Sequence, residues 1–202
     1  MRIAVLVSGG GTNLQALIDN EAGDFPPEEK YEIALVIADR KDIYAIERAE
    51  KHKLPCELVL SPSGIPRSET RRIISDRILE LARRYDIDAL VLAGFLTILN
   101  GDIISEYSGR IINLHPALLP RYGGKGMWGH HVHEAVLAAD ETESGCTVHL
   151  VDAGCDTGPV LLQKKVPVFP GDTAQTLAER ISHEEHSAIV EGTRLLAKRL
   201  RK

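Results

Sequence analysis

Asn113 and His115 are the residues in this sequence whose types and spacing are best suited to chemistry. They lie in the stretch Ile111–Pro120 (IINLHPALLP), which begins as an apolar run and ends in a predicted turn. Side chains two positions apart on an extended chain point to the same face. A carboxamide that donates to an oxyanion and an imidazole that moves a proton would therefore lie side by side at a strand end. This arrangement suits acyl or proton transfer; the alternative is a structural, hydrogen-bonded histidine.

The glycine-rich segment Ser8–Asn13 (SGGGTN) is a candidate anion site. It follows the apolar run Ile3–Val7 and precedes a predicted helix. Glycines let the backbone approach an anion closely, and the free N–H groups at a helix start point towards it. Because the segment matches neither GxGxxG nor GxxxxGK[ST], it favours a single phosphate monoester over a dinucleotide or a P-loop nucleotide. A glycine turn that only caps the helix is the alternative.

Asp152 and Asp156 stand on either side of an Ala-Gly-Cys turn. A carboxylate beside His115 would favour the imidazolium and raise the pKa of the histidine. Aspartates also hydrogen-bond their own turns. The sequence does not decide which aspartate does which.

Further histidines and charged residues outside these stretches carry weaker signals. The spacing of His130, His131, His133 and His149 matches no zinc pattern, so we expect helix-surface and loop histidines and no metal site. Glu185, in the acidic segment HEEH, could face a cleft, although a solvated helix face is the default interpretation.

Buried strands alternate with helices along the first half of the chain, which predicts an α/β fold with a doubly wound, mostly parallel sheet and helices on both faces. Ligands in such sheets bind beyond the carboxyl ends of the strands. The later strands predict an antiparallel extension, with Pro167 favouring an edge position. The predicted strands are Ile3–Val7, Ile33–Ala38, Cys56–Leu60, Ile87–Ala93, the run from Ile111, Cys146–Val151 and Val160–Val168. The predicted helices include Asp42–His52 with Asp42 as N-cap, Arg67–Tyr85, Val132–Ala139 and Ala174–Leu200.

Composition excludes several classes of protein. A length of 202 residues suits one domain, and a net charge of −5 with one Trp and three Phe argues against a nucleic-acid-binding surface. Three cysteines without CxxC spacing suit a reducing compartment. The apolar run at the amino terminus is too short for a signal peptide or a membrane span. We expect a soluble, cytoplasmic protein with no membrane partner.

Four stretches, in this order, resemble the phosphoribosylglycinamide formyltransferase family: VLVSGGGTNLQAL at 5–17, VLAGFLTIL at 91–99, INLHPALLP at 112–120 and DTGPVLLQ at 156–163. The resemblance spans essentially the whole chain. It implies a single formyltransferase domain over 1–202, with a nucleotide- and phosphate-binding half at 1–100 and a catalytic and folate-binding half at 101–202. HPALLP is similar across formyl-transferring enzymes, whereas SGGGTNLQ resembles the loop that holds the ribonucleotide phosphate.

The resemblance also implies roles for single residues. Catalysis falls to Asn113, His115 and Asp156, and substrate binding to Gly11, Thr12, Asn13 and Glu185. The folate cosubstrate would be bound by Arg71, Leu96, Thr97, Ile98, Leu99 and Asn113. Arg67 and Arg72 are neighbouring alternatives to Arg71. Thr97 stands where the family often has Arg or Lys, and the loop after Pro120 is longer than usual.

The implied reaction transfers the formyl group of 10-formyltetrahydrofolate to the amine of phosphoribosylglycinamide, in purine synthesis. It requires neither a metal nor a covalent intermediate. The implied partners are small-molecule substrates, and the implied assembly is a monomer or homodimer. Three alternatives remain. A formyltetrahydrofolate hydrolase usually has an added amino-terminal domain, and a methionyl-tRNA formyltransferase should have a carboxyl-terminal tRNA-binding domain. A non-catalytic nucleotide-binding regulator would leave Asn113, His115 and Asp156 unexplained.

Overall fold

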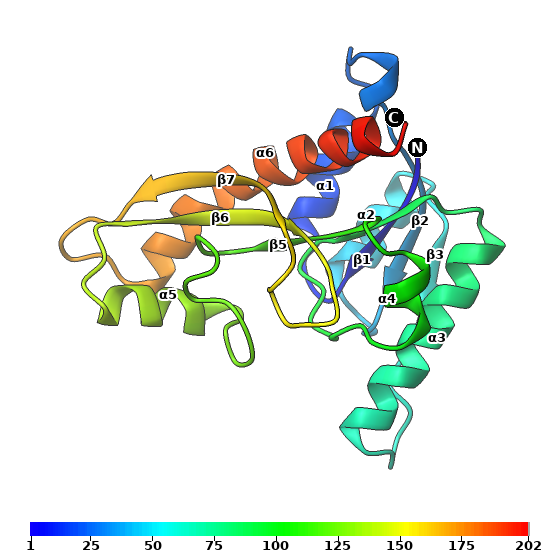
Figure 1. Ribbon diagram of the computed structural model, residues 1–202, viewed down its shortest axis with the longest axis horizontal. Coiled ribbons are helices and arrows are strands. Elements are labelled where there is room, and N and C mark those ends of the chain that lie inside the picture. Colours follow the sequence, from blue (N-terminus) through cyan, green and yellow to red (C-terminus); the bar gives the residue numbers. More distant parts are fainter. Residues whose placement is uncertain (202) are drawn as a thin grey trace.

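A single seven-stranded sheet runs through the computed structural model, in the order β3-β2-β1-β4-β5-β6-β7 (Figure 1). The structure describes residues 1–201, and of residues 67 and 68 it describes only the backbone. The strands are β1 Arg2–Val7, β2 Glu32–Ala38, β3 Cys56–Leu58, β4 Ala89–Leu92, β5 Ile111–His115, β6 Glu143–Leu150 and β7 Val160–Pro167. The helices are α1 Thr12–Glu21, η1 Pro27–Glu29, α2 Tyr44–Lys51, α3 Arg67–Arg84, α4 Asp102–Glu106, α5 His130–Ala138 and α6 Ala174–Leu200.

Strands β1 to β5 run parallel to one another, whereas the pairs β5–β6 and β6–β7 are antiparallel. This confirms the predicted mostly parallel sheet with a late antiparallel extension. Strand β7 lies at the edge, where Pro167 costs no ladder hydrogen bond. The central strands are apolar at nearly every position because both of their faces are covered; residues Ile3–Val7 are fully buried.

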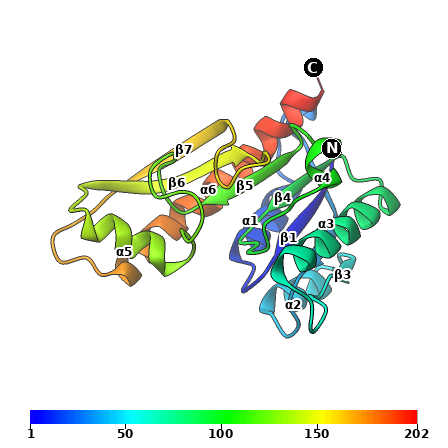
Figure 2. The same ribbon diagram turned by 60° about the horizontal axis from the view of Figure 1, so that its bottom comes forward.

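Helices cover the two faces of the sheet unequally (Figure 2). One face packs against α1, α2, α5 and α6, through side chains such as Leu14, Ala45 and Ile189. The other packs against α3 and α4, through Ile74, Ile78 and Ile103. Helix α6 is long enough to contact α1, β6 and β7, so it joins the parallel half of the sheet to the antiparallel extension (Figure 1).

Helix boundaries differ from expectation in two places that affect function. Asp42 is not an N-cap: α2 begins at Tyr44 after Ile43, and Asp42 takes a left-handed φ of 56° in the preceding turn. Helix α5 begins at His130 rather than Val132, which brings two more histidines into its first turn. Helix α6 is capped by Thr173, whose side chain accepts from the backbone N–H of Thr176.

Among the described residues, 1–201, no helix is long and apolar enough to span a bilayer.

Candidate active site

Three segments singled out from the sequence meet at one edge of the sheet, beyond the carboxyl ends of adjacent strands. In the register, Leu6 of β1 pairs with Leu92 of β4, and Leu92 pairs with Asn113 of β5. The glycine-rich segment, the segment after β4 and the Asn-x-His end of β5 therefore leave the sheet side by side. This is the edge at which parallel α/β sheets bind ligands.

Asn113, His115 and Asp156 form one cluster, although Asp156 lies more than 40 residues further along the chain. The Nδ1 atom of His115 is 3.6 Å from one carboxylate oxygen of Asp156. The carboxamide nitrogen of Asn113 is 3.5 Å from the other. His115 is 4% exposed, so these groups interact where water screens them little. The structure thus brings together the three side chains that the sequence predicted as a unit.

The two aspartates of the turn after β6 have separate functions. Asp152 makes the turn: one of its oxygens accepts from the backbone N–H of Gly154 at 2.9 Å and from the Thr157 hydroxyl at 2.6 Å. Asp156 instead faces the cluster, with its backbone at a left-handed φ of 57°. Its carboxylate also accepts from the backbone N–H of Gly124 at 2.9 Å. This contact connects the loop that follows Pro120 to the site.

The imidazole of His115 has a defined proton position. Its Nε2 atom lies 2.7 Å from the carbonyl oxygen of Tyr122, and a carbonyl can only accept, so Nε2 carries the hydrogen. Nδ1 then faces the Asp156 carboxylate and is the atom that gains or loses a proton. A proton on Nδ1 would be shared with that carboxylate, which suits an acid–base group.

The Asp156 carboxylate raises the pKa of His115 as expected, but the net pKa is lowered. Burial lowers this pKa from its ordinary value, and the Asp156 carboxylate and the Tyr122 carbonyl offset only part of that effect. The sequence showed the neighbouring charge but not the depth at which β5 ends. For Asp156, burial acts to raise the pKa, but the neighbouring imidazoles of His149 and His115 and the hydrogen bond from the Gly124 N–H outweigh it, so the carboxyl pKa is lowered and the group stays ionised.

His149 is a site residue that sequence reasoning missed. It lies on β6 directly opposite Asn113, is 2% exposed, and places Nε2 3.1 Å from the Asn113 carboxamide nitrogen. The same Nε2 is 3.6 Å from Asp156. The available signal was the alternation of the predicted strand CTVHLV, but the cross-strand partner depends on an antiparallel register that a single sequence does not reveal.

The glycine-rich segment Ser8–Asn13 has the geometry of an anion site. Gly11 takes a left-handed φ of 72° immediately before α1, so the N–H groups of Thr12 and Asn13 are the free donors at the helix start. A Cβ on Gly11 would lie 2.7 Å from the Cβ of Ala45, so no other residue fits here. The Arg48 guanidinium braces the loop by donating to the Gly10 carbonyl at 2.9 Å.

Glu185 faces Asn13 at the start of α1 and does not lie on a solvated helix face. Its carboxylate accepts from the Asn13 carboxamide at 3.3 Å, which joins α6 to the start of α1. Burial raises the pKa of the carboxyl, and the hydrogen bond from Asn13 offsets part of the rise. The other amide atom of Asn13, Oδ1, is buried without a partner among the described residues, so the pair has an acceptor available.

The segment Leu96–Leu99 is held by side chains from two other strand ends. The backbone N–H of Leu96 donates to the Ser8 hydroxyl at 2.9 Å, and the Thr97 hydroxyl donates to the buried Asp39 carboxylate at 2.7 Å. Thr97 therefore faces inward, while the side chains of Leu96 and Ile98 are exposed. The segment is therefore held by one backbone N–H and one side-chain hydroxyl.

A pocket of about 470 Å³ opens beside this segment. Its lining combines apolar side chains with exposed turn backbone: Leu99, Asn100, Gly101, Ile104, Ser105, Ser108, Val151, Asp152 and Ala153. Of these, the sequence pointed only to Leu99 and Asp152, because the segment around α4 and the turn after β6 approach each other only in the folded chain.

The arginines of α3 differ in their surroundings. Arg72 is engaged in ion pairs with Asp76 and Asp102. Arg71 lies close enough to Cys155, the neighbour of Asp156, for its charge to lower the pKa of that thiol, although burial raises this pKa overall. Arg71 therefore lies near the turn that carries Asp156, whereas Arg72 is paired elsewhere. The side chain of Arg67 lies outside the described residues.

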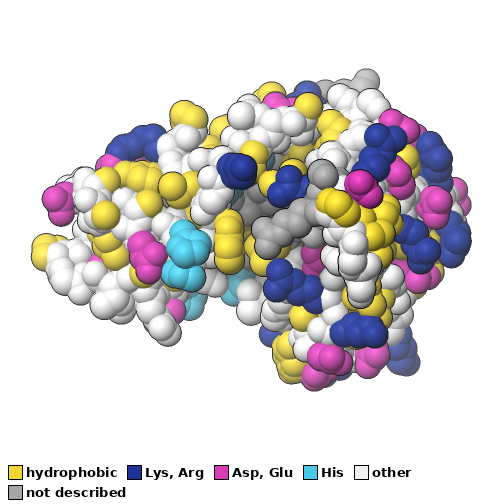
Figure 3. All heavy atoms as spheres, turned by 90° about the horizontal axis from the view of Figure 1, so that it is seen from below, with side chains coloured by type: hydrophobic (Ala, Val, Ile, Leu, Met, Phe, Trp, Pro, Cys, Tyr) yellow, Lys and Arg dark blue, Asp and Glu magenta, His cyan; other side chains and the backbone are white. Residues whose placement is uncertain are grey.

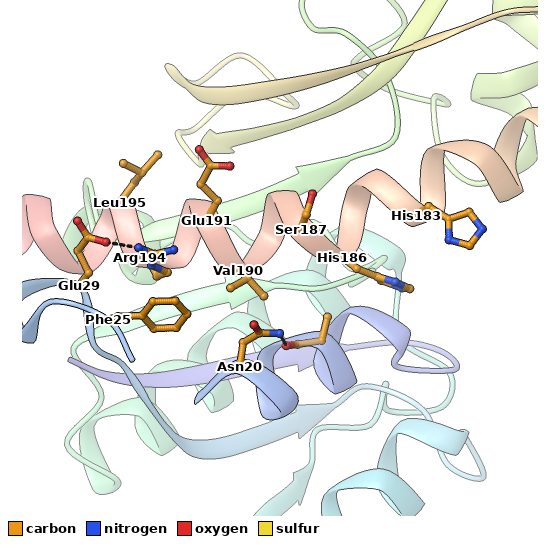
Figure 4. A pocket seen from close by; sticks show the side chains of 11 residues that line it. Asn20, Phe25, Glu29, His183, His186, Ser187, Val190, Glu191, Arg194 and Leu195 are labelled. Atoms are coloured by element: carbon orange, nitrogen blue, oxygen red, sulfur yellow. Dashed lines mark hydrogen bonds and ion pairs between the residues drawn. The ribbon is translucent and has the colours of Figure 1, made fainter. Parts of the chain in front are cut away.

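A larger pocket, of about 690 Å³, lies between α1, α6 and the segment around Phe25 and Glu29 (Figure 4). Arg194 crosses it to pair with Glu29, and His183 and His186 lie further along the same helix. None of the predicted site residues lines it. It is separate from the cluster at the strand ends.

Comparison with known proteins agrees with this geometry. The family model described as formyl transferase matches residues 1–193. The trifunctional purine biosynthetic protein adenosine-3 of Drosophila pseudoobscura pseudoobscura is 43% identical over 97% of this chain, which spans only 14% of that protein. The chloroplastic phosphoribosylglycinamide formyltransferase of Arabidopsis thaliana is 35% identical over 94% of this chain and 63% of that protein.

A solved structure extends the likeness to the whole fold. The glycinamide ribonucleotide transformylase 1 of Symbiobacterium toebii superposes with a TM-score of 0.86 at 37% identity, covering 98% of this chain and 88% of that chain. The chain therefore belongs to the formyl transferase family, and within it to the phosphoribosylglycinamide formyltransferases.

Proposed function

We propose that this chain transfers a formyl group from 10-formyltetrahydrofolate to the amine of phosphoribosylglycinamide, giving formylglycinamide ribonucleotide and tetrahydrofolate in purine synthesis. The observation that carries the proposal is the meeting of Asn113, His115 and Asp156 within hydrogen-bond or ion-pair distance at the strand ends. The glycine-rich loop lies on one side of this cluster, and the 470 Å³ pocket adjoins the segment that follows β4.

The cluster can provide both functions that formyl transfer needs. Attack by the amine forms a C–N bond to the formyl carbon and places negative charge on the formyl oxygen. Asn113 is a donor for that oxygen. In the ligand-free enzyme its carboxamide N–H groups face His149 and Asp156. The contact to Asp156, at 3.5 Å, is the weaker one and is the one we expect substrate to replace.

His115 and Asp156 handle the proton. The attacking amine must lose one proton, and the departing folate nitrogen must gain one, so the reaction is balanced without any other reactant. His115 can take up the proton at Nδ1, where the Asp156 carboxylate stabilises the resulting imidazolium. Because burial holds the pKa of His115 low, the resting imidazole is neutral near pH 7 and ready to accept a proton.

The two substrates approach from different sides. The N–H groups of Thr12 and Asn13 at the start of α1 bind the phosphate, and Glu185 binds the polar part of the ribonucleotide nearest the amine. The donor's pterin ring occupies the 470 Å³ pocket, against Leu99 and the turn that carries Asp152. Pockets of this size, apolar with a few polar groups, suit a flat heterocycle. Arg71 lies on the donor side.

This assignment makes the chain one formyltransferase domain over 1–202, in which 1–100 supplies the phosphate loop and 101–202 supplies catalysis and most of the folate site. Glu185 and Leu96–Leu99 cross that division, because α6 and the β4 segment each reach the other half. Three free cysteines support a cytoplasmic location. Small molecules are the proposed partners of a monomeric or homodimeric enzyme.

A turnover assay with and without the acceptor tests the proposal. With both substrates, formyl should leave the folate and appear on the ribonucleotide in equal amounts. Deformylation of the folate without the acceptor would instead indicate a hydrolase. Binding of the ribonucleotide with no turnover in either mixture would indicate a nucleotide-binding regulator, and either outcome would overturn the proposal.

A further inference from the structure

Two imidazoles and a carboxylate gather at the first turn of α5, on the surface. One ligand atom each from His130, His131 and Glu134 lie within 4.8 Å of one another, and all three side chains are exposed. Histidine side chains are seen together on the face of the molecule shown in Figure 3. From the sequence we expected no metal site here, because the histidine spacing matches no zinc pattern; Glu134 was not considered as a further ligand.

Helix geometry explains the cluster. Side chains three and four positions apart are neighbours on a helix surface, so Glu134 reaches both His131 and His130. The Nδ1 atom of His131 is 3.5 Å from a carboxylate oxygen of Glu134, and the ring centroids of His130 and His131 are 4.1 Å apart. Helix α5 packs through a different set, Val132, His133 and Val136. The exposed cluster is therefore not needed for packing.

The donor set is that of a transition metal. Two imidazole nitrogens and one carboxylate oxygen, with a fourth position open to water, are a common ligand set of Zn²⁺. Imidazole ligands disfavour Mg²⁺ and Ca²⁺, which prefer oxygen. Ligand atoms around a tetrahedral Zn²⁺ are about 3.4 Å apart, given Zn–N bonds of 2.0–2.1 Å. Exposed side chains can close from 4.8 Å to that spacing by rotamer changes alone.

We propose that the first turn of α5 binds one divalent transition-metal ion of the zinc class through His130, His131 and Glu134. The site lies where the loop that follows Pro120 enters α5. The first residues of the same loop, Tyr122 and Gly124, contact the catalytic cluster. A bound ion would fasten the far end of that loop. Binding itself does not depend on the formyl transfer reaction.

Trp128 provides a built-in reporter. It is the only tryptophan of the chain, and its ring packs edge-on against His131 with centroids 5.2 Å apart. An ion bound to His131 changes the charge beside the indole, so tryptophan emission should change as the site fills. The signal arises at the proposed site and nowhere else in the chain.

The test titrates tag-free protein with Zn²⁺ alone, following Trp128 emission and the heat of binding. We expect one ion per chain and full reversal by a chelator. His131→Ala and Glu134→Gln should each weaken binding about tenfold or more, because even groups that only support metal ligands contribute that much. His130→Ala tests the third ligand by calorimetry and leaves the Trp128–His131 contact in place.

Three controls separate this site from others. Asp156→Asn alters the catalytic cluster, which also holds two imidazoles and a carboxylate, and His183→Ala alters the histidine pair on α6; both variants should bind Zn²⁺ as the unmodified enzyme does. The absorption spectrum of bound Co²⁺ should show nitrogen and oxygen ligands without thiolate. No binding at millimolar Zn²⁺, binding that survives His131→Ala and Glu134→Gln in folded protein, or loss of binding in Asp156→Asn would overturn the proposal.

Discussion

The Nε2 atom of His149 lies 3.1 Å from the carboxamide nitrogen of Asn113. The other ring nitrogen of His149 is 2.9 Å from the Leu150 carbonyl, which can only accept, so Nδ1 carries the hydrogen and Nε2 accepts from Asn113. The histidine thus orients the carboxamide and keeps its nitrogen on the side of Asp156. His149 is a positioning residue in this arrangement and does not need to touch substrate.

Replacing His149 tests that relationship. His149→Ala frees the Asn113 carboxamide to rotate, and we expect kcat to fall about tenfold to a hundredfold, less than the 10²–10³ expected for loss of the donor itself. KM values should change little. His149→Gln supplies another acceptor and should recover part of the rate. If both variants lose the same activity and the same thermal stability, His149 is only a core residue.

Asn113→Ala should retain the fold and lose most turnover. Removal of one oxyanion donor costs on the order of 10²–10³ in rate. The side chain is only partly buried, so the substitution leaves a small cavity and a modest loss of stability. Steady-state rates and a thermal melt measured on the same preparation check both statements. A variant with near-normal turnover would remove Asn113 from the mechanism.

Asp156→Asn should lower the pKa of His115 further. The carboxylate is the charge that opposes the effect of burial on that pKa, and the amide cannot replace it. Asparagine tolerates the left-handed φ of 57° at this position, so the backbone should stay in place. We expect turnover to drop by about 10²–10⁴ with milder effects on ligand binding. NMR titration of His115 in both proteins decides: an unchanged pKa would show that Asp156 is not its partner.

Local patterns in the sequence were sufficient to predict the sheet and the pairing of Asn113 with His115 at a strand end, but not the contacts across the chain. The apolar run at Ile3–Val7 and the Asn-x-His spacing are properties of neighbouring residues, and both predicted the structure correctly. The roles of Asp152 and Asp156 could not be separated in the same way. Their difference lies in one left-handed backbone angle and in the approach of Gly124, both set by tertiary packing.

The same limit explains the errors. The pKa of His115 depends on how deeply β5 ends in the molecule, and the partner of Asn113 depends on the register of an antiparallel neighbour. Asp42 is not the cap because it lies two residues before Tyr44, the first residue of α2, and takes a left-handed φ of 56° in the preceding turn, a conformation that aspartate can adopt.

Gly11→Ala and Gly10→Ala form a matched pair for the phosphate loop. A Cβ at Gly11 meets Ala45 and requires a left-handed φ, which costs roughly 1–2 kcal/mol before the clash is counted. A Cβ at Gly10 meets nothing within 4 Å. We expect Gly11→Ala to weaken binding of the ribonucleotide much more than binding of the folate. Gly10→Ala should leave the free energy of unfolding unchanged. Separate titrations of the two ligands check this; equal losses for both ligands in Gly11→Ala would indicate general misfolding.

Glu185→Gln should stabilise the ligand-free enzyme near neutral pH and weaken binding of the ribonucleotide. Burial raises the pKa of Glu185, so the folded state favours the neutral carboxyl. That contribution to stability is fully present below the ordinary glutamate pKa of about 4.5 and is lost as the pH rises through the raised value. Glutamine is neutral at every pH and can still accept from Asn13, so Glu185→Gln does not lose this stability as the pH rises.

The melting temperature of Glu185→Gln should therefore exceed that of the unmodified enzyme at pH 7–8, and the difference should shrink towards pH 4. A gain of 1 kcal/mol would appear as about 2–4 °C in a chain of this size. Loss of the charge should raise KM for the ribonucleotide about tenfold to a hundredfold, since hydrogen bonds to charged groups contribute roughly 1.5–3 kcal/mol. Glu184→Gln, at the next position of α6, is the matched control and should change neither quantity. Equal melting temperatures of Glu185→Gln and the unmodified enzyme from pH 4 to 8 would show that the Glu185 carboxylate carries no cost in the folded state.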